Sequence, residues 1–444
     1  MKQILIIGNG FDLKCGLKST YKDFFNWKFN QVYNKKEEFI KLLCSKRVST
    51  QYKKLIKNSL YNLVEKDNEE GFVNLIEKHI RQNDMYQIFC KLKPMEITFW
   101  DLVFILAKYY LSKTQLNQWQ DIENIIYNVV SFAFDGKNMF KTNLRFSQAK
   151  EKLIHFRFND LHKNPDHKNP DFDIRTKCKE TFKNDVKLMA MCEGKGKNIS
   201  VKTNFLLSQL YVFESSFAKF IDFQVNENRY KYESAAKNLI FQLTKNHFGS
   251  IKKLHVLSFN YSLDNLFSKN LRNPNFQLVS WRNIHGVANV RSVKALNKNC
   301  WQPIFGIDNH DLLGKSVSND PRIMFTKSYR LLDNDINSLN KYNHSTYDDA
   351  DLITIFGHGL GRADYSYFES IFDENNLYNS STVLQVYYNS GSNDIKNKHN
   401  CITAVVNLLN NYGQTLSDTH GDNIVNKMIL ENRLEVLPSK KNSN

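Results

Sequence analysis

The first seventeen residues constrain the fold of this chain more than any other stretch. An apolar run at residues 4–7 leads directly into glycines at positions 8, 10 and 16. A buried strand that ends in a Gly-x-Gly turn is the way in which α/β proteins bring backbone N–H groups to a phosphate. We expect Gly8 to allow a tight turn and Gly10 to let a ligand approach the backbone, because neither has a Cβ. The position of the third glycine departs from the common dinucleotide fingerprint G-x-G-x-x-G. The pattern predicts a nucleotide loop of unusual spacing, and a tight turn without a ligand is the alternative.

The length and the charge of the chain indicate more than one domain and an anionic partner. Its 444 residues suit two domains, or one domain with a large insertion. The formal net charge is +16, and residues 137–202 contain 16 Lys and Arg against 8 Asp and Glu. A basic excess favours contact with nucleic acid or anionic ligands. A solvated basic surface is the other interpretation, because no zinc-finger or RNA-binding signature accompanies the charge.

The cysteines and the apolar segments indicate a soluble protein of a reducing compartment. Seven cysteines are scattered along the chain and include no C-x-x-C pair, which argues against a disulfide framework and against a zinc site. We therefore predict no metal. The most apolar later segment, residues 98–111, carries Asp101 and Lys108 and is too short to span a membrane. These features predict a cytoplasmic protein without membrane contact.

The spacing of apolar residues changes near position 250. Before it, apolar residues recur at three- and four-residue intervals, which predicts helices over 21–29, 72–80, 99–111, 119–134, 205–225 and 235–246. Residues 159–200 are rich in Pro, Asn, Asp and Lys, and we interpret them as an exposed loop. Beyond position 250, short apolar runs predict strands at 254–259, 276–279, 303–307, 352–356, 383–388 and 434–438. Helical patterns alternate with these strands at 263–270, 365–374, 400–411 and 424–431.

Strands that alternate with helices imply a mostly parallel sheet with both faces covered. The predicted fold class is therefore α/β, with a Rossmann-like, mostly parallel sheet and a large all-helical insertion. We predict that residues 1–20 and 250–440 form a discontinuous Rossmann-like nucleotide-binding domain. Residues 21–249 form the helical insertion domain, with the exposed basic loop near 159–200.

Polar or glycine-rich groups follow four of the predicted strands. Ligands of open α/β sheets bind beyond the carboxyl ends of the strands, so these groups form a composite candidate site. The four groups are residues 8–12, 259–262, 284–286 and 357–364. Helix capping is the alternative role of Asn260, Asp12 and Asp364, because Asn and Asp are frequent N-caps. For His285 and His358 the alternative is a turn residue without chemistry.

These motifs, in this order, resemble the AbiH family of bacterial phage abortive-infection proteins. The resemblance rests on GNGFDLKCGLKSTYKDF, FNYSLDNLF, IHG, FGID and FGHGLGRADYSYFESIF. It covers the N-terminus and most of the C-terminal third of the chain. The glycines at 8, 10 and 16 also have the spacing of the opening loop of sirtuin-type NAD-binding domains. The resemblance therefore implies antiviral defence and a sirtuin-like core.

The sirtuin-like resemblance implies a role for each matching residue. Gly8, Asn9 and Gly10 would contact the pyrophosphate and ribose of NAD. Asn260 and His285 would be catalytic, Asn260 at the nicotinamide ribose and His285 as the histidine that accepts a proton. The full set of cofactor-binding residues that we predict is Gly8, Asn9, Gly10, Phe11, Asp12, Tyr261, Gly286, Gly357, His358, Gly359 and Asp364.

Three positions depart from the sirtuin pattern. Asp12 replaces the usual Ser of the opening loop, Ser262 stands where many sirtuin-like defence proteins carry Asp, and Gly359 replaces a common Ser. A carboxylate beside a pyrophosphate is unfavourable unless it faces ribose hydroxyls. The structural zinc cysteines of deacetylating sirtuins are absent from the sequence, which argues against deacetylation.

The resulting hypothesis is hydrolysis of NAD or a related nucleotide, which depletes the cofactor of an infected cell. A nucleotide-binding sensor without turnover is one alternative. A nucleic-acid-binding or nuclease effector is another, and its densest carboxylate run is Asp348, Asp349 and Asp351. Besides the nucleotide ligand, the partners that the sequence leaves open are a phage-derived trigger, a second copy of the chain and nucleic acid.

Overall fold

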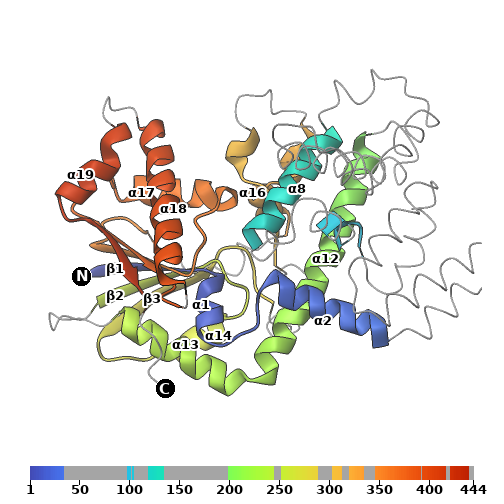
Figure 1. Cartoon of the computed structure of the whole chain (residues 1–444), viewed down its shortest axis with the longest axis horizontal. Coiled ribbons are helices and arrows are strands. Elements are labelled where there is room, and N and C mark those ends of the chain that lie inside the picture. Colours follow the sequence, from blue (N-terminus) through green and yellow to red (C-terminus); the bar gives the residue numbers. More distant parts are fainter. Residues whose placement is uncertain are drawn as a thin grey trace, which may run out of the picture. The chain divides into compact units, whose positions relative to one another are not determined.

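Figure 1 shows the computed structural model of the chain, which divides into two compact units. The first unit consists of Met1–Asp23, Phe217–Lys315 and Thr326–Asn444, and the second of Phe24–Ser216 and Ser316–Phe325. The residues that the structure describes are 1–34, 98–101, 103–104, 119–134, 199–244, 252–288, 303–312, 320–334, 346–391, 393–416 and 421–439.

The first unit is built on a six-stranded sheet in which every neighbouring pair of strands is parallel. Its strands are β1 (Lys2–Ile7), β2 (Lys252–Ser258), β3 (Phe276–Asn283), β4 (Leu352–Phe356), β5 (Val383–Tyr388) and β6 (Leu434–Pro438). Their order across the sheet is β3-β2-β1-β4-β5-β6. This order is that of the Rossmann fold, so the predicted fold class is confirmed. The order reverses between β1 and β4, and that point is where ligands of such sheets bind.

One face of the sheet packs against three helices near the C-terminus. These helices are α17 (Tyr365–Glu374), α18 (Asp394–Thr415) and α19 (Ile424–Leu430), and Figure 1 shows them together in orange and red. Ile4 and Ile353 lie in neighbouring strands and share one buried cluster with Phe368 of α17 and Leu409 of α18. Strands covered on both faces need apolar side chains at consecutive positions, which explains the uninterrupted apolar run of β1.

The other face is covered by α1 (Asn9–Lys14) and α13 (Arg229–Leu243), which Figure 1 shows on the opposite side of the sheet from α17 and α18. Gln3 points to this face, because side chains alternate along a strand and Ile4 points to the other. The Gln3 Nε2 donates to the carbonyl oxygen of Leu243 at 3.2 Å and to the Thr354 hydroxyl at 2.8 Å. The buried side-chain amide of Gln3 thus forms hydrogen bonds with both α13 and β4.

Shorter elements complete the described part of the first unit. They are α14 (Asn265–Lys269), α16 (Lys327–Asp333) and the 3₁₀ helices η3 (Asn309–Leu312), η7 (Arg362–Asp364) and η8 (Gly421–Asn423). The helix η5 (Pro321–Phe325) belongs to the second unit, and α2 (Tyr21–Asn34) and α12 (Ile199–Glu227) have residues in both units.

The second unit has an aromatic, helical core. Besides parts of α2 and α12 it contains α8 (Trp119–Phe134). The rings of Phe24 and Phe104 contact Phe213 with centroids 5.5 and 5.2 Å apart, and all three side chains are buried. The buried Lys28 ammonium pairs with Asp101 at 2.7 Å. This pairing offsets the cost of removing both charges from water.

Most of the predicted elements that fall on described residues are present in the structure, and one predicted strand is not. The predicted strands at 352–356, 383–388 and 434–438 and the helices at 119–134 and 365–374 coincide with elements of the structure. The predicted strand at 303–307 is wrong, because residues 303–306 are not in a strand and Ile307 makes only an isolated bridge with Thr326. Ile304, Phe305 and Ile307 are nevertheless buried. A short apolar run indicates burial and does not by itself distinguish a strand from other buried segments.

Several predictions concern residues that the structure does not describe. The helix predicted at 72–80 lies entirely outside the described residues, and so does most of the one predicted at 99–111. The basic segment 137–202 and the loop at 159–200 also lie outside them, apart from residues from 199 onward in α12. The predicted domain boundaries stay a prediction.

Candidate functional site

The loops that follow β1 and β4 contact each other at the point where the strand order reverses. The N–H of Gly8 donates to the carbonyl oxygen of Phe356 at 3.0 Å, and the N–H of Gly10 donates to that of Gly357 at 2.7 Å. A Cβ on Gly10 would lie 2.7 Å from the Cα of Gly357. A Cβ on Gly357, which has a φ of +69°, would lie 2.3 Å from the backbone nitrogen of Phe11. These glycines therefore permit close contact between two backbones, and Gly357 fills the space beside Gly10 that we had expected a ligand to take.

Asp12 lies at the centre of a buried polar group contributed by three segments. Its carboxylate accepts hydrogen bonds from the Tyr232 hydroxyl at 2.7 Å, the Ser262 hydroxyl at 2.7 Å and Asn260 Nδ2 at 3.0 Å. Asn260 Nδ2 also donates to the carbonyl oxygen of Gly8 at 2.9 Å. Burial raises the pKa of Asp12 to about 6, although the three hydrogen bonds oppose the shift. All three donors are uncharged, so their hydrogen bonds offset the cost of burying a negative charge only in part.

The structure excludes the helix-capping role that was the alternative for Asn260. The side chain of Asp264 caps α14, where it accepts from the backbone N–H groups of Leu266 and Phe267. Asn260 instead directs its amide nitrogen to Gly8 and Asp12. Asp12 lies within α1 and makes its side-chain contacts with residues far away in the sequence.

A second buried polar group surrounds Asp364. The Oδ1 of Asp364 lies 2.6 Å from the Lys327 ammonium and 3.4 Å from His285 Nε2, and its Oδ2 lies 3.2 Å from His358 Nε2. His285 follows β3, His358 and Asp364 follow β4, and Lys327 begins α16. All four side chains are largely buried. The segments after β3 and β4 are thus joined through one carboxylate.

Charge in this second group is set by the Lys327–Asp364 ion pair. Burial favours the neutral form of Asp364, but the charge of Lys327 outweighs it and the hydrogen bond from His358 adds to the effect, so the pKa of Asp364 falls well below its usual range. Burial, and next the nearby Lys327, lower the pKa of His285 to about 3. His285 is therefore a neutral imidazole at neutral pH. His358 Nδ1 accepts from the N–H of Leu360 at 3.0 Å, so its Nε2 carries the proton that faces Asp364.

Asp364 occupies the N-cap position of α17, yet its side chain makes no capping hydrogen bond. Asp308 performs that role, because its Oδ2 accepts from the N–H of Ser366 at 3.0 Å. Asp308 is buried and also accepts from the Ser366 hydroxyl. The capping of α17 by Asp308 leaves the Asp364 carboxylate to Lys327 and the two histidines.

Among the residues that the structure describes, two buried polar atoms beside Asp364 find no hydrogen-bond partner: His285 Nε2 and the Tyr367 hydroxyl. The two rings are in contact, with centroids 5.3 Å apart. The Phe259 ring packs against His285 at 5.3 Å and against His358 at 4.6 Å. Buried polar atoms in proteins nearly always have a partner. These two atoms therefore indicate a place where a ligand or an ordered water donates or accepts.

Other predicted contact residues have structural partners. Tyr261 donates its hydroxyl to the carbonyl oxygen of Ile304 at 3.2 Å, and the buried Phe11 ring contacts Phe356. The Asn9 side-chain oxygen accepts from the Ser19 hydroxyl at 2.6 Å. Gly286 is buried with a φ of +89°, and Gly359 lies in the exposed turn after β4. The roles predicted for these residues stay predictions.

Sequence reasoning missed Lys327 and Tyr232. A signal for Lys327 exists, because the preceding Thr326 is an N-cap whose hydroxyl accepts from the N–H of Tyr329. That signal locates the start of a helix but not the contact with Asp364. Tyr232 lies on α13 and reaches Asp12 across 220 residues of sequence. No local pattern in the sequence predicts that contact.

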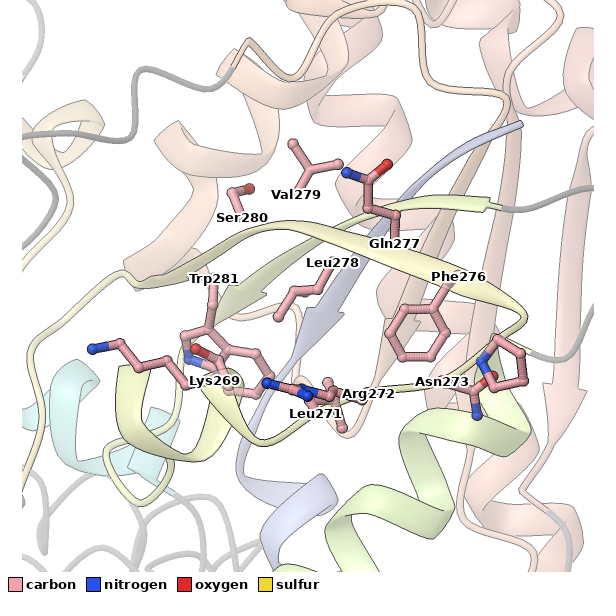
Figure 2. Close-up of a pocket in the computed structure, with 12 residues that line it drawn as sticks. Lys269, Leu271, Arg272, Asn273, Phe276, Gln277, Leu278, Val279, Ser280 and Trp281 are labelled. Atoms are coloured by element: carbon pink, nitrogen blue, oxygen red, sulfur yellow. The ribbon is translucent and has the colours of Figure 1, made fainter.

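A groove of about 830 Å³ lies beside β3, away from both polar groups. Figure 2 shows Leu278 and Trp281 of β3 on the side of the strand that faces Leu271. The residues lining the groove come from β3 and from the segment that starts at Ser268, and they include none of the predicted site residues. A smaller cavity lies next to the Asp12 group, with Ser262, Arg229 and Glu233 in its wall.

The geometry defines a Rossmann-like α/β protein with buried polar groups at the carboxyl edge of its sheet. Residues 4–388 match the family described as "Bacteriophage abortive infection AbiH". The chain belongs to this family, and it is a bacteriophage abortive infection protein. Comparisons with curated proteins and with solved structures give no match.

Two features that bear on membranes and on metals are absent from the described residues. No helix among them is both long enough and apolar enough to cross a membrane. They also contain no group of three or more His, Cys, Asp or Glu residues placed to hold a metal ion.

Proposed function

We propose that this protein acts in abortive infection by hydrolysing NAD, or a related nucleotide, at the carboxyl edge of its parallel sheet. The observation that carries the proposal is His285 Nε2, which is buried and has no hydrogen-bond partner within the described part of the chain. It lies beside the loop that follows β4, where the strand order reverses. Ligands of Rossmann-type sheets bind at that point.

The chemistry of the reaction suits a site with a neutral histidine. Cleavage of the nicotinamide–ribose bond passes through an oxocarbenium-like transition state, as glycoside hydrolysis does. The bonding electron pair leaves with nicotinamide, whose ring is cationic in NAD, so the leaving group needs no proton. Water forms the new bond to the ribose carbon and releases one proton. His285 is neutral because burial lowers its pKa to about 3. It is therefore a weak base in the free protein, and its role here is to accept a hydrogen bond that orients the attacking water, whose proton leaves to solvent.

Asn260 and Asp364 supply the orientation that such a reaction requires. The amide nitrogen of Asn260 is held by Gly8 and Asp12, so its Oδ1 is the atom that can accept a hydrogen bond from a ribose hydroxyl or a water. Asp364 holds Lys327 and lies 3.4 Å from His285. Precise placement of the reacting groups accounts for a large part of enzymatic rate enhancement.

A nucleotide-binding sensor without turnover is the second candidate, and one observation favours it. The N–H of Gly8 already donates to the carbonyl oxygen of Phe356, the last residue of β4, and the N–H of Gly10 donates to that of Gly357 in the loop that follows. A phosphate that used these donors would have to separate the two loops. Binding would then be coupled to a conformational change, which is the property of a sensor.

The test is to follow free nicotinamide after NAD is added to the purified protein, and to follow NAD in phage-infected cells that express it. We compare the wild type with His285→Gln and Asn260→Ala. We expect either substitution to reduce the rate by roughly 100-fold or more, the range of a lost acid–base or orienting group. His255→Gln is the matched control, because His255 is also buried but bonds Ser280 within the sheet.

The outcomes separate the two candidates. Nicotinamide release that is undiminished in both folded variants contradicts the assigned site. Saturable NAD binding by calorimetry, with no release of nicotinamide in either setting, favours the sensor. The absence of both binding and release contradicts both candidates.

A further inference from the structure

The side chains of Asp12, Tyr232 and Ser262 form a closed ring of short oxygen–oxygen contacts. The Tyr232 hydroxyl lies 2.7 Å from Asp12 Oδ1, and the Ser262 hydroxyl lies 2.7 Å from Asp12 Oδ2. The two hydroxyl oxygens lie 2.8 Å from each other. Each of these distances is that of a normal O–H···O hydrogen bond. The ring therefore contains three contacts that each require a proton.

An ionised Asp12 leaves this ring one proton short. Each hydroxyl carries one proton, and a carboxylate carries none. If Tyr232 and Ser262 both donate to the carboxylate, their own oxygens face each other at 2.8 Å without a proton between them. A carboxylic acid supplies the third proton. Asp12 then donates to Ser262, Ser262 donates to Tyr232, and Tyr232 donates back to Asp12.

The surroundings of Asp12 agree with the neutral form. Asp12 and Tyr232 are each 2% exposed, and Ser262 is 9% exposed. Burial raises the pKa of Asp12 to about 6, so the carboxylic acid predominates below about pH 6. The described titratable groups that face it are Tyr232 and Cys15, and burial raises the pKa of both above their ordinary values. Both are uncharged at neutral pH, so neither supplies a positive charge that would hold Asp12 ionised.

We propose that Asp12 is a positioning residue that fixes the side-chain amide of Asn260 and that carries the third proton of the ring in mildly acidic solution. One N–H of Asn260 Nδ2 donates a hydrogen bond to Asp12 Oδ1 at 3.0 Å, and the other donates to the Gly8 carbonyl oxygen at 2.9 Å. Both of these atoms are acceptors, so the amide cannot turn over without losing two hydrogen bonds.

This orientation defines what Asn260 recognises. Its Oδ1 takes a hydroxyl or N–H donor, such as a ribose hydroxyl, and repels a phosphate oxygen. This deduction about the ligand rests on the proposed function. The protonation of Asp12 does not rest on it, because that follows from contacts within the protein.

The first test is the pH dependence of thermal unfolding in the wild type and in Asp12→Asn. The variant amide has the shape and the donor of the carboxylic acid, so its Nδ2 can donate to Ser262 while its Oδ1 accepts. The pKa of Asp12 is about 6 in the folded protein and near 3.8 in the unfolded chain. The folded state binds the extra proton, so the wild type loses this contribution as the pH rises from about 4 through about 6. The variant has no such loss.

We expect the unfolding temperature of Asp12→Asn, minus that of the wild type, to increase between about pH 4 and about pH 7 and then to level off. Asp422→Asn is the matched control, because it makes the same change at an exposed carboxylate. We expect no such increase there. A difference that stays constant or falls for Asp12→Asn overturns the proposal.

Infrared spectroscopy gives a second measurement that does not depend on stability. The difference between the wild-type and Asp12→Asn spectra near pH 5 should contain the carbonyl stretch of a protonated carboxyl group, and it should weaken above the pKa of about 6. Absence of this band at every pH overturns the proposal.

The positioning role has its own test in the assay of nicotinamide release. We expect Asp12→Asn to keep most of the activity and Asp12→Ala to lose it, because only the amide preserves the contact with Asn260. Equal loss in two folded variants overturns the positioning role. If the wild type itself releases no nicotinamide, the proposed function fails, and the unfolding and infrared measurements still decide the protonation of Asp12.

Discussion

Gly10 donates its backbone N–H to the carbonyl oxygen of Gly357 across 2.7 Å, and this bond joins the loops that follow β1 and β4. The two loops lie where the order of the parallel strands reverses. The same contact leaves no room for a Cβ on Gly10 or on Gly357. The glycines after these strands are therefore required for the folded structure, whether or not a nucleotide binds beside them.

Gly357→Ala should destabilise the protein more than Gly16→Ala. Both glycines have a positive φ, +69° and +85°, which costs an alanine about 1–2 kcal/mol. At Gly357 the new Cβ would also lie 2.3 Å from the Phe11 nitrogen, whereas nothing lies within 4 Å at Gly16. Overpacking of this kind adds roughly 1–3 kcal/mol. Denaturant unfolding measures both variants, and equal losses would show that the two loops do not pack as described.

Lys327→Met should strongly destabilise the folded state. The substitution keeps the apolar stem of the side chain and leaves Asp364 buried without the ammonium that lies 2.6 Å away. Removing one partner of a buried ion pair typically costs about 3–5 kcal/mol. Adding Asp364→Asn to Lys327→Met should recover part of that free energy of unfolding, because no charge then remains unpaired. Additive losses in the double-mutant cycle would be inconsistent with this pair.

The same substitution should raise the pKa of His285. Lys327 is the nearby positive charge that, after burial, contributes most to lowering this pKa to about 3. Without it, His285 faces Asp364 at 3.4 Å with no competing cation in the pair. NMR titration of the imidazole in Lys327→Met and in the wild type gives the shift directly. An unchanged or lower pKa would contradict the assigned electrostatics.

His285 should make the protein less stable in acid. Its folded pKa of about 3 lies below the ordinary histidine value of 6.5, so the unfolded chain binds the extra proton. Stability from this group is present above about pH 6.5 and is lost as the pH falls toward about 3. We expect His285→Gln to lose less stability than the wild type over that range, measured as unfolding temperature against pH. His399→Gln, at an exposed histidine, should follow the wild type.

Asp308→Ala should loosen the start of α17. The buried Asp308 carboxylate accepts from the backbone N–H groups of Ser366 and His310. Its loss leaves these donors without their acceptor, at a cost of about 1–3 kcal/mol. Hydrogen exchange at the Ser366 amide should become faster, while exchange within α18 should change only as much as the global stability does. Unchanged exchange at Ser366 would exclude Asp308 as the cap.

The sequence predicted the strands of the sheet from runs of apolar residues. Apolar residues at consecutive positions mark β1 and β4, and the bounds of β4, β5 and β6 were predicted to the residue. The same criterion failed at residues 303–307, where Ile304 and Phe305 are buried without belonging to a strand. A run of apolar residues indicates burial. A strand also needs hydrogen bonds to a neighbouring strand, and the run itself does not specify that neighbour.

The sequence also directed attention to the right end of the sheet. Because carboxyl ends of parallel strands share one edge, the residues after four predicted strands could be expected together, and Asn260 does contact Gly8. The side-chain contacts of these residues could not be predicted from the sequence. Asp364 could equally have been a helix cap, and only the position of Asp308 shows that it is not.

By itself the sequence determined the fold class, the family and the edge of the sheet where polar residues gather, because periodicity and short motifs are local properties of the chain. Only the tertiary structure decided that Lys327 neutralises Asp364, that Gly357 fills the space beside Gly10, and that Tyr232 and Ser262 close a ring with Asp12. Each of these contacts joins segments whose sequences contain no pattern that would predict their pairing. Their energies come from burial and from hydrogen-bond geometry, which exist only after the chain has folded.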